Sequence, residues 1–321
     1  MKRAIIFAAA LLVASWAMAQ NNSQSGTQAQ KPPAQGAAEG TQAQPGAAGA
    51  QGQAAPGAAG QAAPAAKRPP QAKTQEEYKA FQAAAQAATP EAQEKAADDF
   101  AAKFPNSELR TLLYRQTMNS YQNANNADKM VEMGRKILAI DPNDPQALIE
   151  VAEVISEQAR STDLDFNQKT DEANKLATHA LETVDTDLMF SPNAPPEKVQ
   201  AAKDWLKATA YAILGNIAME KHDYAGAEKN LKQAIDLGKT QPDPVNYLRL
   251  AVALDNQTKY AEALATANQA VSMTQENTTV GQLSRQEQSR LKQLAGASGG
   301  APANQPKPQA PTSPQPETPH P

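Results

Sequence analysis

Residues 211–234 read YAILGNIAMEKHDYAGAEKNLKQA, and residues 247–270, 36 positions later, read YLRLAVALDNQTKYAEALATANQA. Aromatic, small and aliphatic residues occupy the same places in both segments. A repeat of this length is typical of a solenoid, in which helix pairs stack and bury a core that no single pair can form alone. The chain is therefore predicted to be an all-helical repeat protein.

The spacing inside one segment predicts two helices joined by a short turn. Apolar residues recur at intervals of three and four within 211–218 and again within 227–234, which places each set on one face of a helix. The polar residues 221–223 form the turn between them. Gly215 is expected where the two helices approach closely, with Leu231 filling the space between them.

This pattern resembles the tetratricopeptide repeat. An aromatic residue stands three positions before Leu-Gly, and an Ala-x3-large-x2-Ala stretch follows in the second helix. The unit departs from the family pattern at Ala218, where an aromatic residue is usual, and in its late prolines, Pro242 and Pro244. In the unit 208–241 the matching residues are Tyr211, Leu214, Gly215, Ala227, Leu231 and Ala234.

Two other units match the pattern less completely. In the unit 244–277, Ala251 replaces the glycine, one small residue for another. A unit that begins near Thr111 has Met130 and Gly134 where the family has an alanine and a large residue. The similarity is therefore most specific in the last two units.

The remaining units are more divergent. One begins near Leu148 and contains extra residues around 161–169, and a degenerate first unit begins near Tyr78. A sparsely apolar segment, 280–295, is expected to form a capping helix, the alternative being an extension of the last unit. The resemblance implies an all-α, right-handed α-solenoid of about five helix pairs over residues 74–295, with disordered arms on both sides.

One large aromatic residue leaves two interpretations open. Trp205 precedes Tyr211 on a helix expected to start after Pro195-Pro196, because proline is tolerated in a first helical turn. It is expected to pack against the loop 185–194. The alternative is an exposed apolar patch that receives a partner.

The ends of the sequence predict export. Residues 1–19 combine two basic residues, an apolar run and Ala-Met-Ala, the pattern of a cleaved signal peptide. The run is shorter than the roughly 20 apolar residues of a membrane span, so an uncleaved anchor is the lesser alternative. Residues 20–73 and 296–321, rich in Gln, Ala, Gly and Pro, are expected to be disordered. The mature protein is expected to be periplasmic or secreted.

Composition excludes several functions. The chain has no cysteine, hence neither a disulfide nor a lipid-modified cysteine, and its formal net charge of -4 offers no basic patch for nucleic acid or anionic lipid. Its three histidines do not form a ligand pair, and no phosphate-binding loop or Gly-x-Ser-x-Gly elbow is present. We expect no catalytic residues, no metal, no cofactor and no stable membrane insertion after signal cleavage.

A protein-binding groove is what the resemblance implies. In tetratricopeptide proteins the first helix of each pair lines the groove, and amide side chains there both donate to and accept from a peptide backbone. Arg115 and Asn119 match half of the clamp by which some family members hold a terminal carboxylate. This mode is not expected, because the next unit has Glu150 and Glu153 where the clamp needs an amide and a cation, and these would repel a carboxylate. The family's groove positions become Arg115, Asn119, Gln122, Asn123, Ile149, Glu153, Glu157, Asn216, Glu220, Leu248, Asp255 and Asn256.

The predicted function is that of a non-catalytic scaffold or adaptor of the cell envelope, which binds a peptide or protein segment. The alternative is a structural protein that self-associates through its repeats. The sequence does not identify the partner.

Overall fold

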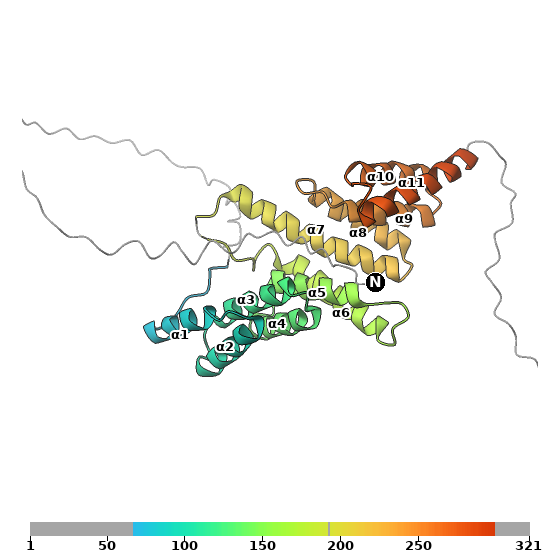
Figure 1. Ribbon diagram of the computed structural model, residues 1–321. Helices are drawn as coiled ribbons and strands as arrows, with labels where there is room; N and C mark the ends of the chain where they lie inside the picture. Colours follow the sequence, from blue (N-terminus) through green and yellow to red (C-terminus); the bar gives the residue numbers. More distant parts are fainter. Residues whose placement is uncertain (1–66, 192, 299–321) are drawn as a thin grey trace, which may run out of the picture. The chain divides into compact units, whose positions relative to one another are not determined.

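The computed structural model describes residues 67–191 and 193–298 (Figure 1). The chain divides into two units, Met1–Ala62 and Ala63–Pro321, and all described residues belong to the second. The expected signal peptide, 1–19, lies outside the described residues. So do the expected arms, apart from residues 67–73 and 296–298.

Helices dominate the described residues, which contain eleven of them and no sheet. Five successive pairs and a closing helix account for all of these helices, which confirms the predicted all-α repeat fold. The elements are α1 (Gln75–Ala85), α2 (Pro90–Lys103), α3 (Arg110–Asn123), α4 (Ala127–Ile140), α5 (Pro145–Gln158), α6 (Phe166–Thr183), α7 (Pro196–Glu220), α8 (Tyr224–Leu237), α9 (Pro244–Asn256), α10 (Tyr260–Ser272) and α11 (Thr279–Ser298).

Each helix packs against its pair partner, and the second helix of each pair packs against the helix that follows it. Some odd-numbered helices also contact each other, such as α5 with α7 and α7 with α9. Helix α11 packs on both α9 and α10, and its Leu291 is fully buried in one core with Leu231, Leu250 and Leu254. This packing identifies α11 as the expected capping helix.

Three of the pairs share one turn geometry. Asn125, His222 and Thr258 each follow the first helix of a pair and adopt positive φ angles of 54°, 57° and 62°. The next residue then donates its backbone N–H to a carbonyl five positions earlier, as from Asp223 to Ala218 at 2.8 Å and from Lys259 to Leu254 at 3.0 Å. These bonds satisfy carbonyls that the helix end leaves free. The repetition of this turn establishes the repeat independently of side-chain identity.

Prolines begin four of the described helices, among them α2 at Pro90 and α5 at Pro145. Pro196 is the first residue of α7, as the sequence predicts, and Pro244 is the first residue of α9. Asp243 caps α9 by accepting from Val245 N at 2.9 Å. Pro244, which stands later than the proline of the family pattern, therefore begins the next helix. In the first helical turn its missing N–H costs no hydrogen bond.

Glycines mark two close crossings. A Cβ added to Gly215 would lie 2.7 Å from Leu231 Cγ, which confirms the expected contact between α7 and α8. One added to Gly134 would lie 2.3 Å from Val151 Cγ2 of α5 and 3.4 Å from Met118 Sδ of α3. Only a residue without a side chain fits either place.

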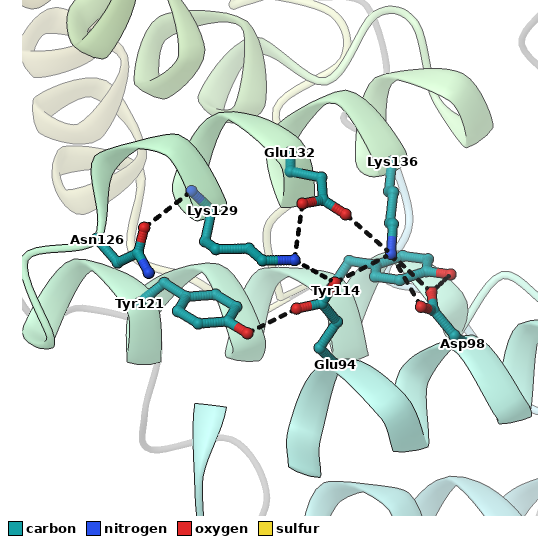
Figure 2. A network of polar contacts seen from close by, with 8 residues as sticks. All are labelled: Glu94, Asp98, Tyr114, Tyr121, Asn126, Lys129, Glu132 and Lys136. Atoms are coloured by element: carbon teal, nitrogen blue, oxygen red, sulfur yellow. Dashed lines mark hydrogen bonds and ion pairs between the residues drawn. The ribbon is translucent and has the colours of Figure 1, made fainter. Parts of the chain in front are cut away.

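A polar network joins α2, α3 and α4 (Figure 2). Tyr114 donates to Asp98 at 2.9 Å, and Tyr121 donates to Glu94 at 2.6 Å. Lys129 of α4 binds the second oxygen of Glu94 at 2.9 Å. Burial, followed by the hydrogen bond to Glu94, raises the pKa of Tyr121 to about 12. The divergent second unit thus uses its tyrosine hydroxyls to hold neighbouring helices.

One sequence expectation is wrong. Trp205 is 37% exposed and is not a core residue; the buried residues of α7 begin only at Leu206. Leu188, Met189 and Phe190 in the preceding loop are each half-buried.

Candidate interaction face

Helix α5 carries three carboxylates on one face. It begins after Asp144, whose side chain accepts from Ala147 N at 2.9 Å. Glu150, Glu153 and Glu157 follow at intervals of three and four, so they point to the same side of the helix. All three are half-buried. Apolar residues such as Val151 and Val154 occupy the other faces and are buried.

Partial burial disfavours the charged form of these carboxylates. Desolvation, with smaller contributions from Glu157 and Glu150, raises the pKa of Glu153 to about 7. Desolvation also raises the pKa of Glu150 and of Glu157, although nearby arginines oppose the change. The three groups therefore form a cluster whose negative charge is incompletely compensated.

An arginine from a different pair faces this cluster. Burial lowers the pKa of Arg249 on α9, while Asp243, Glu157, Glu153 and Glu220 act in the opposite direction. Helix α7, which ends at Glu220, contacts both α5 and α9, so it lies between the carboxylates of α5 and Arg249. We name Glu150, Glu153, Glu157, Glu220, Asp243 and Arg249 the α5 face.

Most side chains of the α5 face have no ion-pair partner. In the described part of the chain, the side chains of Glu153, Glu157, Glu220 and Arg249 take part in no salt bridge and in no hydrogen bond with another side chain. Asn246, one turn before Arg249, is buried and its Oδ1 has no hydrogen-bond partner. Buried polar groups usually have a hydrogen-bond partner in the protein or in ordered water.

No family model and no curated protein matches this chain. Among solved structures, it aligns with MamA at 13% identity and a TM-score of 0.35, covering 57% of this chain and 96% of that one. A thermophilic TPR protein from Thermus thermophilus aligns at 16% identity and a TM-score of 0.35, covering 68% and 98%. The assembly chaperone of RpL4 (Acl4) aligns at 13% and 0.34, covering 70% and 95%.

The fold follows from the helix order, the packing and the shared turn described above. The TM-scores are too low to add support. The fold is tetratricopeptide-like.

Two sequence-predicted site residues of this tetratricopeptide-like array are already engaged. Arg115 is buried and pairs with Asp144, and its Nη1 lies 3.6 Å from Glu150 Oε2. Asp255 pairs with Arg290 of the capping helix. Both charges hold helices together, so we no longer place them among the groups that meet a partner.

Of the two apolar groove positions, Ile149 is a core residue at 2% exposure, so its placement in the groove is wrong, and Leu248 is half-buried. The polar residues that remain divide into two groups. Glu153, Glu157 and Glu220 come together on the α5 face, with Asn216 half-buried one turn before Glu220 on α7. The other amides lie on α3 and α9. On α3, Asn119 and Asn123 are exposed and Gln122 is half-buried. On α9, Asn256 is exposed and donates to Val252 O of its own helix at 2.9 Å. The structure does not gather these last amides into one site.

The family positions miss Glu150 and Arg249. Each stands two residues after the aromatic or leucine position of its unit, Leu148 in one and Tyr247 in the other. The recurrence of a charged residue at that place in two units is the signal that could have found them. The family positions also miss Asp243, because this residue caps α9 just before Pro244 and so lies in the loop, outside the helix that carries those positions.

Other candidate sites are not supported. The residues that line a shallow hollow, among them Asn174, Thr178 and His179, all belong to α6, so it is not a groove between helices. Among the described residues, no three or more His, Cys, Asp or Glu side chains are arranged so that they could hold a metal ion together. No described helix is both long and apolar enough to span a membrane.

Proposed function

We propose that this protein is a non-catalytic interaction scaffold that binds a segment of a partner protein at the α5 face. The observation that carries the proposal is the set of half-buried charges there, of which Glu153, Glu157 and Arg249 have no ion-pair partner. A role in the cell envelope is part of the proposal and rests on the signal-like residues 1–19.

The chemistry of the face indicates what the segment contains. Half-buried carboxylates are stabilised by cations and N–H donors. Arg249 offers the opposite contact, since its guanidinium donates to carbonyl or carboxylate oxygens. A segment with a Lys or Arg side chain toward Glu153 and Glu157, and backbone carbonyls toward Arg249, satisfies both. The resemblance to tetratricopeptide proteins favours such binding over catalysis.

A crosslinked pull-down from the native envelope tests the proposal. The double variant Glu153→Gln/Glu157→Gln removes two negative charges while keeping the side-chain size. The matched control, Glu262→Gln/Glu276→Gln, removes two exposed carboxylates from α10 and the loop after it. We expect the wild type and the control to capture the same protein, and the α5-face variant to lose it. Equal capture by all three chains would contradict the proposed site, and capture only of further copies of this chain would favour self-association.

The raised pKa of Glu153 also predicts a pH dependence of stability. Its folded-state pKa of about 7 exceeds its ordinary value of 4.5, so between these values the folded state binds more protons than the unfolded state. Stability is therefore greatest below the ordinary value and falls as the pH rises through about 7.

In the wild type, this ionisation should lower the unfolding free energy by about 1 to 3 kcal/mol, since one pKa unit corresponds to about 1.4 kcal/mol. In Glu153→Gln, which cannot ionise, this decrease should be absent. Urea denaturation of both chains at about pH 5 and about pH 8 measures this difference. Parallel changes in the two chains would mean that Glu153 ionises freely and that the face is better solvated than proposed.

A further inference from the structure

A basic segment lies against the loops between helix pairs. Residues 67–73, KRPPQAK, which the sequence assigns to the linker, precede α1 and are called the strap here. Lys67 forms an isolated parallel β-bridge with Met189 in the α6–α7 loop. Its Nζ lies 2.6 Å from Asp141 Oδ2 and 3.7 Å from Asp187 Oδ1. The strap thus starts where two loops present carboxylates.

Further along, the strap reaches the loop between α2 and α3. Arg68 binds both oxygens of Glu108, at 2.7 and 2.8 Å, and Gln71 N donates to the same carboxylate at 3.3 Å. Lys73 Nζ donates to the carbonyl of Asn106 at 2.8 Å. All three cationic side chains of the strap therefore have an acceptor on a loop.

These acceptors belong to three successive connections between pairs: α2–α3, α4–α5 and α6–α7. In a repeat array each pair contacts only its neighbours, whereas the strap contacts three connections at once. Pro69 and Pro70 favour an extended backbone and donate no N–H groups. An extended segment with cations at its start and its end matches a row of acceptors along one edge. We call Asn106, Glu108, Asp141, Asp187 and Met189 the loop edge.

We propose that the loop edge is a docking surface for an extended, basic, proline-containing segment, and that a partner segment of this chemistry replaces the strap. Charge complementarity supports this occupant, because three acidic side chains of the edge face Lys67 and Arg68. The bidentate contact of Arg68 with Glu108 adds geometric selectivity for arginine.

The contact of Arg68 is the weaker part of the strap, since Lys67 and Asp141 are less exposed, at 34% and 19%. The side chains of Arg68 and Glu108 are 61% and 39% exposed. Ion pairs with this exposure contribute little and are screened by salt. In the free protein the strap still occupies the loop edge because it is part of the same chain. Covalent attachment gives such a segment an effective concentration in the millimolar range. Removing the strap's cations should therefore open the edge to the same segment added from solution.

The test uses the full chain and a fluorescent synthetic peptide with the sequence of residues 67–73. Anisotropy titrations compare the wild type with Lys67→Ser/Arg68→Ser, which keeps the edge and removes its competitor. We expect the peptide to bind this variant at least about tenfold more tightly than the wild type, and to bind more weakly as salt is added. A control peptide with serine in place of its lysines and arginine should not bind.

A second variant locates the binding. It adds two substitutions on the loop edge, Glu108→Gln and Asp141→Asn, to the strap variant Lys67→Ser/Arg68→Ser. Peptide binding should be abolished while the far-UV circular dichroism spectrum stays unchanged. If helix content falls, Glu108→Gln alone, at an exposed side chain, replaces the pair. Equal affinity for the wild type and the strap variant would overturn the proposal, as would failure of the strap variant to bind at millimolar peptide. This surface is separate from the α5 face, so either proposal can fail while the other holds.

Discussion

The pairs α3–α4 and α7–α8 reach the same close packing with opposite residues. In α7–α8 the first helix supplies the small residue, Gly215, and the second supplies the large one, Leu231. In α3–α4 the corresponding position of the first helix is Met118, four residues after Tyr114, and Gly134 stands in the second. Each pair therefore combines one glycine with one large buried side chain.

This exchange shows that the volume at the crossing matters more than the residue at either position. A packed interior accepts a change in one side chain when its neighbour compensates. Gly134 looks like a departure from the family pattern when its helix is considered alone. Together with Met118 it forms the mirror image of the pair Gly215 and Leu231.

The largest effect should follow from removing the large member of each pair. Leu231 and Met118 are 0% and 1% exposed, so Leu231→Ala and Met118→Ala should each lower the unfolding free energy by about 2 to 5 kcal/mol. Urea denaturation measures both. A cost well under 1 kcal/mol for Met118→Ala would show that Met118 does not fill the space above Gly134, and the comparison would fail.

A smaller and unequal effect is expected when the glycines gain a methyl group. In Gly134→Ala the new Cβ would meet Val151, whose branched side chain has little rotamer freedom. In Gly215→Ala it would meet the side chain of Leu231, which adjusts more easily. We expect a loss of about 1 to 3 kcal/mol at Gly134 and less at Gly215, where improved helix propensity offsets part of the cost. The reverse order in thermal or urea unfolding would mean that α4 is less tightly held than α8.

Exchanging the large and the small residue in α7–α8 tests directly whether the two positions compensate for each other. Gly215→Met and Leu231→Gly, made singly and together, turn α7–α8 into a copy of α3–α4. Because the two residues touch, the double variant should lose less stability than the sum of the singles, by about 0.5 to 3 kcal/mol. Strict additivity in this double-mutant cycle would show that the two sites pack independently.

The smallest effect concerns the shared turn. Thr258 has a positive φ, which is unfavourable for a β-branched residue, whereas Asn125 occupies the same place with a residue that tolerates it. Thr258→Gly should therefore raise the unfolding free energy by up to about 1 kcal/mol, and Asn125→Gly should change it less. Thermal melting compares the two variants, and equal shifts would mean that the turn at Thr258 is unstrained.

Periodicity predicted the fold because each repeat contact is local. The intervals between Tyr211 and Ala234 specify both helices of a pair, and Pro196 marks the start of α7. The candidate face was only partly predicted: Glu153, Glu157 and Glu220 occupy family positions, while Arg249 joins them through packing between pairs. The strap could not be predicted, because Lys67 and Asp141 are 74 residues apart and the segment lies in a composition that favours disorder.

The strap also determines how the repeat unit carries tension. The chain reaches α1 only after crossing the loop edge, so a pulling force applied ahead of Lys67 acts first on Asp141 and Met189, in the interior of the array. Helix α1 bears no load while these contacts hold. Because the contacts lie one after another along the strap, they break singly at low force. The segment released in this way has a contour length of about 25 Å, at about 3.5 Å per residue, and its release requires no helix to unfold.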